Sequence, residues 1–204
     1  MEQLAGTSIY QVSARILNLI AGDLQASSTK AYLASLRQSV NRDVHLATGV
    51  FPVIFSNIPT EYLGESGDLT SGERSIILAL QLFALHQQGS DQSVNAQSDP
   101  KADKAFADLG KSLRSLRAVD DSQAIDRRFN AMITATSFDE LANHLRHLIK
   151  LLKSRTDTKV DYAQLAQDLF WFQKGQKSSI RLKWSRSYYR HYNDDKGEDS
   201  NEGQ

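Results

Sequence analysis

The sequence contains no cysteine, which excludes disulfide bonds, thiolate catalysis, iron–sulfur clusters and thiolate zinc sites. It has no uninterrupted apolar run of about 18 residues, so no transmembrane helix is expected. The first residues lack a basic stretch followed by an apolar one, and we therefore expect no signal peptide. With a composition of 40% hydrophobic and 24% charged residues, these absences predict a cytoplasmic globular protein.

The chain also has no net charge, but its charges are unevenly placed. Residues 1–100 hold five Lys/Arg against nine Asp/Glu, whereas residues 101–192 hold eighteen against ten. The last stretch, 193–204, is acidic again, with one lysine against five acids. A basic middle segment in a neutral protein indicates one face that meets nucleic acid. The alternative is that these charges only solvate helix exteriors.

Apolar residues recur at helical spacing through most of the chain, and no segment has the alternation typical of a strand. Capping boxes at Thr70–Glu73 and Ser137–Glu140 predict the starts of two long helices, and Asp161 is predicted to cap another. Residues 50–59 hold two prolines and predict a short interrupted helix or a buried turn. In the first helix we place Leu19 on the apolar stripe. The fold class expected is all-α.

We expect the helices to form a two-lobed bundle. The predicted N-terminal lobe spans 1–100 and ends in a polar segment, 89–103, which has almost no large apolar residues and so predicts a flexible loop or a hinge. The basic C-terminal lobe is predicted at 104–192. The acidic stretch 193–204 has nothing to bury and is predicted to be disordered.

The strongest basic pattern lies on the helix predicted from Ser137. Arg146, Lys150 and Lys153 follow one another at spacings of four and three, which places them in a line beside the apolar arc of that helix. A line of cations with few interleaved acids suits a phosphate backbone. The adjacent Arg127 and Arg128 point about 100° apart, so we expect one to pair with Asp120, Asp121 or Asp126 and the other to be free for phosphate.

Aromatic and cationic residues alternate after residue 170, as they do in sites for single-stranded nucleic acid. Aromatics at helical spacing are more often core, so Trp171 and Trp184 are expected to pack inside. The tyrosines, Tyr188 and Tyr189 among them, are expected to be more open.

The sequence offers little that could carry catalysis. His144 and His147 lie three residues apart without a third ligand, so no metal site is expected. No phosphate-binding loop, nucleophile elbow or paired carboxylate is present. We therefore expect a protein without catalytic residues, cofactor or metal. A metal-dependent nuclease stays as a hypothesis to be tested.

An ordered series of segments resembles the small subunit of the type I-E CRISPR effector complex Cascade, the CasB family. These segments are LFALHQQG (82–89), GKSLRSLR (110–117), RRFNAMI (127–133), LANHLRHLIKLLK (141–153), VDYAQLAQDLFWFQKG (160–175) and RLKWSRSYY (181–189). The resemblance implies an all-helical, two-lobed, non-catalytic subunit that supports antiviral defence. It implies as partners the large subunit, the backbone subunits, a second copy of the chain, the guide RNA and the target DNA with its displaced single strand, and no membrane.

By resemblance, Arg37, Arg74, Arg127, Arg128, Arg146 and the cations after Phe172 fall where the family carries basic residues. Together with the cations placed by helical pattern, the candidate nucleic-acid-binding residues are Arg37, Arg42, Arg74, Lys111, Arg114, Arg127, Arg128, Arg146, Lys150, Lys153, Lys177 and Arg181. The alternative is a helical structural adaptor that makes only protein–protein contacts.

Overall fold

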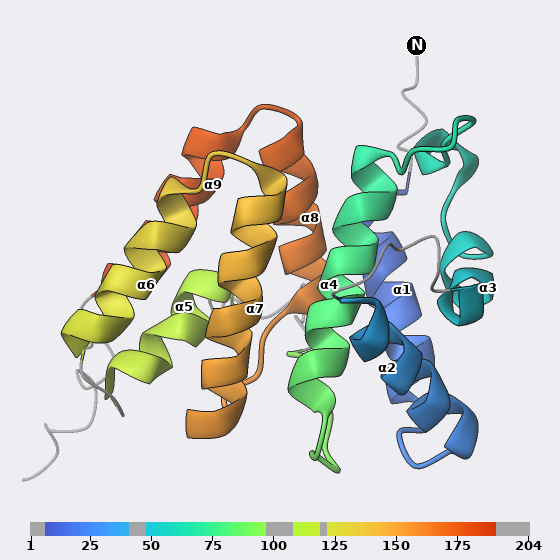
Figure 1. Ribbon diagram of the computed structural model, residues 1–204, viewed down its shortest axis with the longest axis horizontal. Helices are drawn as coiled ribbons and strands as arrows, with labels where there is room; N and C mark the ends of the chain where they lie inside the picture. Colours follow the sequence, from blue (N-terminus) through green and yellow to red (C-terminus); the bar gives the residue numbers. More distant parts are fainter. Residues whose placement is uncertain (1–6, 41–47, 97–107, 119–121, 191–204) are drawn as a thin grey trace, which may run out of the picture.

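The structure is a computed structural model that describes residues 7–40, 48–96, 108–118 and 122–190. Within these ranges every regular element is a helix, and the only bridge is an isolated one between Asn95 and Val160, which confirms the predicted all-α class. The elements, in order, are α1 (Ile9–Ala21), α2 (Ser27–Ser39), the 3-10 turn η2 (Thr48–Val50), α3 (Phe51–Phe55), η3 (Thr60–Tyr62), α4 (Ser71–Gln87), α5 (Leu109–Arg114), η4 (Ser115–Ala118), α6 (Ser122–Thr134), α7 (Phe138–Arg155), α8 (Tyr162–Gln173) and α9 (Lys177–Tyr189) (Figure 1).

The predicted helix starts are formed by the residues expected to cap them. Thr70 accepts a hydrogen bond from the backbone N–H of Glu73 at 3.1 Å, and the Glu73 carboxylate accepts from the N–H of Thr70 at 2.7 Å. Asp161 caps α8 by accepting from Gln164 at 2.8 Å. Ser137 caps α7 in the same way. These bonds satisfy amides that the first helical turn leaves unpaired, and so each start is fixed locally.

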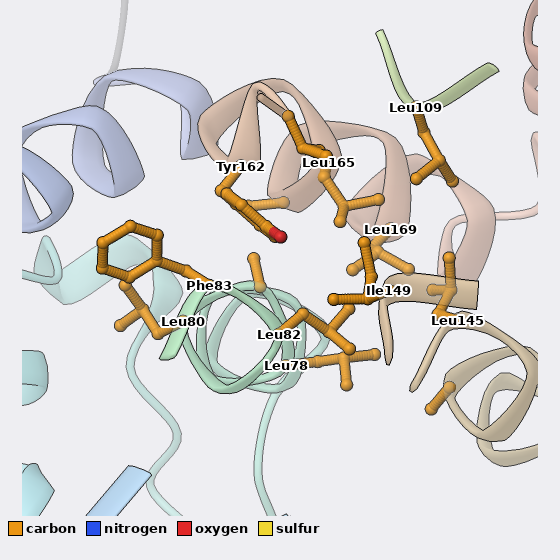
Figure 2. Packing of buried hydrophobic residues seen from close by; sticks show 14 of the residues in the cluster. Leu78, Leu80, Leu82, Phe83, Leu109, Leu145, Ile149, Tyr162, Leu165 and Leu169 are labelled. Atoms are coloured by element: carbon orange, nitrogen blue, oxygen red, sulfur yellow. The ribbon is translucent and has the colours of Figure 1, made fainter. Parts of the chain in front are cut away.

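Helix α4 lies at the centre of the molecule. Nearly all of its side chains are buried, and it packs against α1, α2, α7 and α8. A helix that is apolar on every side has to be covered on every side, which explains its position. Figure 2 shows Leu82 of α4, Ile149 of α7 and Leu169 of α8 pointing toward one another.

Helix α8 connects the two halves of the chain. It packs against α1 and α4 from the N-terminal half and against α9 from the C-terminal half. Polar bonds reinforce these contacts, because Gln167 of α8 accepts from the N–H of Tyr10 and Gln173 donates to Ser75. The buried apolar residues accordingly form one continuous cluster from α1 to α9. The division into two lobes stays a prediction. If two lobes exist, they share this core through α8.

The first part of the predicted flexible loop is held in place. Gln87 donates to the carbonyl oxygens of Ser90 and Gln92, and Val160 donates to that of Val94. Asn95 is buried and accepts from the N–H of Tyr162. Residues 90–96 therefore pack against the start of α8. The low apolar content of this segment could not indicate that packing, because the side-chain amides of Gln87 and Asn95 supply the bonds. Residues 97–103 of that loop, Asp120, Asp121 and the stretch 193–204 lie outside the described residues.

Three predictions of burial or exposure are wrong. Leu19 is 60% exposed and Trp171 is 39% exposed, although both occupy apolar positions in the sequence pattern. Tyr188, expected to be open, is fully buried and stacks on Phe129 with 3.8 Å between ring centroids. Leu145 of α7 and Leu169 of α8 are buried as predicted, whereas Phe138 and Phe170, predicted on the same apolar faces, are partly buried.

Candidate nucleic-acid interface

Helix α7 carries the row of cations predicted from the sequence. Its apolar arc, which includes Leu145 and Ile149, is buried against the neighbouring helices, so the flanks of the arc are left at the surface. Lys150 is exposed, whereas Arg146 and Lys153 are partly covered. The row therefore runs along an edge of α7, and its Lys153 end reaches Gln88, the residue that follows α4.

Arg146 lies in a half-buried place without full hydrogen bonding. Its Nε atom is buried and has no hydrogen-bond partner among the described residues. Burial lowers the pKa of Arg146, and the nearby carboxylate of Asp139 acts in the opposite direction. A guanidinium that keeps its charge in such a place retains N–H donors for an anion.

Arg37 of α2 and Lys153 of α7 meet at the last turn of α4 from two sides. Arg37 Nη1 donates to the carbonyl oxygen of Ala84 at 3.4 Å, and Lys153 Nζ donates to Gln88 Oε1 at 3.0 Å. Burial lowers the pKa of both groups, and the positive charge of Arg37 lowers that of Lys153 further. Both cations are held by neutral oxygens, at a helix end that itself carries partial negative charge.

Arg74 of α4 is engaged differently. Its Nη2 forms an ion pair with Asp139 at 2.9 Å, and its guanidinium lies over the ring of Phe138, 4.8 Å from the centroid. The pair is well exposed, so it adds little stability. A phosphate at this end of the row would have to compete with a carboxylate.

A shallow hollow lies on the other side of α7, where α6 packs against it. It is lined by Arg127, Arg128 and Ala131 of α6 and by Asn143, His144, His147 and Leu148 of α7. Both arginines are exposed, and neither contacts an acid among the described residues. Two of the three acids proposed as partners, Asp120 and Asp121, lie outside the described residues, so the predicted pairing stays a prediction. The third, Asp126, is not their partner, because it is taken by a residue that the pattern did not single out.

That residue is Arg117 of η4. Its Nε atom lies 2.8 Å from the Asp126 carboxylate, and its guanidinium is placed over the rings of Tyr188 and Tyr189. Tyr188 donates its hydroxyl hydrogen to the same carboxylate at 2.7 Å. The sequence gives no signal for this cluster, since its members come from three elements that only the tertiary fold brings together.

The remaining candidate cations serve different surroundings. Lys177 donates to the carbonyl oxygen of Thr136 at 2.7 Å and Arg181 to that of Ala135 at 2.6 Å, so both tie α9 to the turn between α6 and α7. Arg114 donates to the carbonyl oxygen of Arg190 at 3.1 Å. Lys111 is exposed on α5, and Arg42 lies outside the described residues.

The aromatic residues of α8 and α9 are mostly internal. Trp184 is buried as predicted, and its Nε1 donates to the carboxylate of Asp168, which also pairs with Lys183 at 2.8 Å. Trp171 and Tyr189 keep part of their rings at the surface. Stacking platforms for bases are therefore few in this part of the described surface.

Two other kinds of feature are absent from the described ranges. No three His, Asp or Glu side chains gather there as a metal-binding group. No helix in the same ranges is long and apolar enough to cross a membrane.

The fold and this surface define a class: an all-helical protein with cations gathered along both flanks of one helix. The family model for CRISPR-associated protein Cse2 matches residues 32–189, and the chain therefore belongs to the Cse2 family. This confirms the resemblance found in the sequence, since Cse2 and CasB denote the small subunit of type I-E Cascade. The family is a structural component of that complex.

Solved structures agree on the fold. The crystal structure of CasB from Thermobifida fusca has a TM-score of 0.69 and 23% identity, covering 88% of this chain and 97% of that one. CasB from M. ruber gives 0.59 and 25%, covering 90% and 94%. A chain of a CRISPR RNA-guided surveillance complex gives 0.64 and 18%, covering 89% and 94%. A search of curated protein sequences finds no significant match.

Proposed function

We propose that this chain, as a subunit of the Cascade surveillance complex, binds the nucleic-acid backbone without reading its sequence. In this role it stabilises the hybrid of guide RNA and target strand together with the displaced DNA strand. The family assignment and the likeness to a chain of a surveillance complex support the setting. A displaced strand has arbitrary sequence, and so charge and stacking have to hold it in place of base readout.

One observation carries the proposal: Lys150 and Lys153 of the α7 row, and Arg37 beside them, form no ion pair among the described residues. Lys150 is exposed, and Lys153 and Arg37 rest on neutral oxygens. Surface cations that serve only solubility are usually interleaved with acids on the same helix face, as Glu140 is with His144. Neighbouring cations without acids between them, as at Lys150 and Lys153, are suited to successive phosphates.

The proposed protein partners are the large subunit, the backbone subunits and a second copy of this chain. Their contact surfaces would lie away from the α7 row. Leu19 of α1 and Leu182 of α9 support this placement, since both are large apolar side chains at least half exposed on other helices.

The same apolar residues favour a second candidate, a helical adaptor that makes only protein–protein contacts. In that case the cations would meet acidic protein surfaces. The two functions differ in what the isolated protein does with DNA, and a salt titration separates them.

The experiment measures binding of single-stranded DNA to the isolated protein by fluorescence anisotropy. If about four phosphates are neutralised, affinity should fall about 50-fold between about 50 and about 200 mM salt. A charge-reversed variant, Lys150→Glu with Lys153→Glu, should lose most of the affinity and most of the salt dependence. Arg146 is left unchanged because its half-buried guanidinium also packs against the fold.

The matched control reverses two cations outside the row, Arg15→Glu with Lys159→Glu, which changes the net charge by the same amount. It should keep most of the affinity. Equal loss in both variants would mean that only net charge matters, and absence of binding at low salt would favour the adaptor. If the variant of the row fails to assemble with the other subunits, the row is a protein interface.

A further inference from the structure

The hollow between α6 and α7 has a feature that the α7 row lacks, because two histidines line it beside two arginines. His147 Nδ1 lies 2.8 Å from the carbonyl oxygen of Asn143, one turn earlier on the same helix. A carbonyl oxygen can only accept, so Nδ1 carries the hydrogen and donates it. Nε2 is then the nitrogen left to meet a ligand in the hollow.

In this arrangement the His147 ring can bind an anion only in its protonated state. In neutral His147, Nε2 is a bare acceptor and would place its lone pair against an anion. When the ring takes up a proton, Nε2 becomes a charged N–H donor. The same nitrogen thus changes from repelling a phosphate oxygen to binding it.

His144 is placed to act in the same direction. It lines the same hollow, and its Nε2 lies 3.9 Å from a carboxylate oxygen of Glu140, the acid one turn earlier. Glu140 is itself fixed, since it accepts from the N–H and the hydroxyl of Thr136. The two histidines therefore share a hollow with one oriented acid at its edge.

The other charged groups near the hollow come from each element packed on α7. Arg127 and Arg128 face it from α6, and Lys150 follows His147 by three residues on α7. Arg117 of η4 is engaged with Asp126, and Arg74 of α4 with Asp139 on the opposite flank. Arg127, Arg128 and Lys150 outnumber Glu140 at the edge of the hollow, so the local balance is positive and favours an incoming anion as the partner of protonated His147.

We propose that this hollow is a proton-linked phosphate site: Arg127 and Arg128 bind a backbone phosphate at any pH, and His147 and His144 add to it only when protonated. The proposal rests on the nucleic-acid-binding function proposed above and specifies how one part of that surface works. Binding at the hollow therefore strengthens as the pH falls, whereas binding along the α7 row does not change.

The test uses an oligothymidine, whose bases do not take up protons in the range measured. Anisotropy titrations from about pH 8 to about pH 5.5 at fixed ionic strength should show the wild-type protein binding about tenfold tighter at the acidic end. The variant His144→Gln with His147→Gln should match wild type near pH 8 and lose most of the gain. Circular dichroism at each pH checks that the helices stay folded.

Controls separate this proposal from its foundation. The variant His45→Gln with His191→Gln removes as many titrating groups elsewhere in the sequence and should keep the full gain. A variant of the α7 row farther from the hollow, Lys153→Glu, should bind more weakly at every pH but keep the ratio between the two ends. If wild type binds DNA without pH dependence, or if the double histidine variant keeps the gain, the proton-linked site is wrong while the general function stands. Absence of binding at all pH values overturns both.

Discussion

His86 is a buried base whose charge the fold does not accommodate. It lies at the end of α4, is 4% exposed, and its Nδ1 is 2.9 Å from the hydroxyl of Tyr162. Burial, and secondarily the charge of Lys153, lower the pKa of His86 to about 4. The folded protein therefore keeps this ring neutral under conditions in which the unfolded chain would protonate it.

We expect stability to fall on acidification for this reason. Since the folded pKa lies below the unfolded one, the contribution is fully present above about pH 6.5 and is lost as the pH drops toward about 4. The contribution of His86 to the free energy of unfolding that is lost in this way is about 3 kcal/mol. Urea unfolding at several pH values would measure it.

The matching variant is His86→Gln, whose amide can still bond to Tyr162 but does not titrate. It should flatten the stability profile in this range. A profile as steep as that of wild type would show that other groups cause the loss.

For single residues, the sequence predicts which cations stay at the surface better than it predicts which groups the other cations contact. Helical spacing correctly places Lys150 outside the apolar arc, because the arc is a property of one helix. It cannot show that Lys177 and Arg181 donate to carbonyl oxygens more than forty residues away, at the turn before α7. Whether each cation contacts phosphate stays a prediction.

Among the helices, α5 and α9 approach each other closely at Gly110. A Cβ atom added there would overlap the carbonyl oxygen of Trp184, a backbone atom that cannot move without shifting α9. Gly110 is buried, and no larger residue fits at this crossing. The glycine thus sets the distance between the two helices.

We expect Gly110→Ala to destabilise the protein by about 1–3 kcal/mol, because overpacking forces backbone shifts. Chemical denaturation would measure the loss. Gly67→Ala is the matched control, since an added Cβ at this exposed glycine meets no neighbour. Its effect should stay within about 0.5 kcal/mol. Equal effects of the two would contradict the close crossing.

Helix starts were predictable because a cap is a local arrangement of three or four residues, as at Thr70 and Asp161. Which face of α9 is buried was not. Tyr188 turns inward because Phe129 stacks on it and Asp126 accepts its hydroxyl hydrogen, and both lie on α6. Leu19 and Trp171 were predicted to be buried but are exposed, because an apolar residue is buried only if a neighbouring helix covers it.

For the whole molecule, the continuous core predicts cooperative behaviour. Because α8 packs against helices from both halves, neither half has a complete core alone. We expect a single unfolding transition, in spite of the two lobes predicted from the sequence.

The variant Trp171→Phe leaves Trp184 as the sole tryptophan. Its fluorescence should follow the same urea transition as far-ultraviolet circular dichroism. Adding Leu165→Ala opens a cavity in the buried face of α8 and should lower the free energy of unfolding by about 2–5 kcal/mol, so that both curves shift together to lower urea concentration. Loss of tryptophan signal while much of the helix remains would show independently folding lobes instead.

The bond between Lys153 and Gln88 has a consequence for the speed of binding. Lys153 donates to the neutral amide of Gln88, so a phosphate can replace that amide as its partner without breaking an ion pair. Arg74 must first break its ion pair with Asp139. We expect DNA to engage at the Lys153 end of the row and to reach Arg74 later. An encounter that begins at one end and proceeds along a helix edge would give the strand a preferred direction of entry.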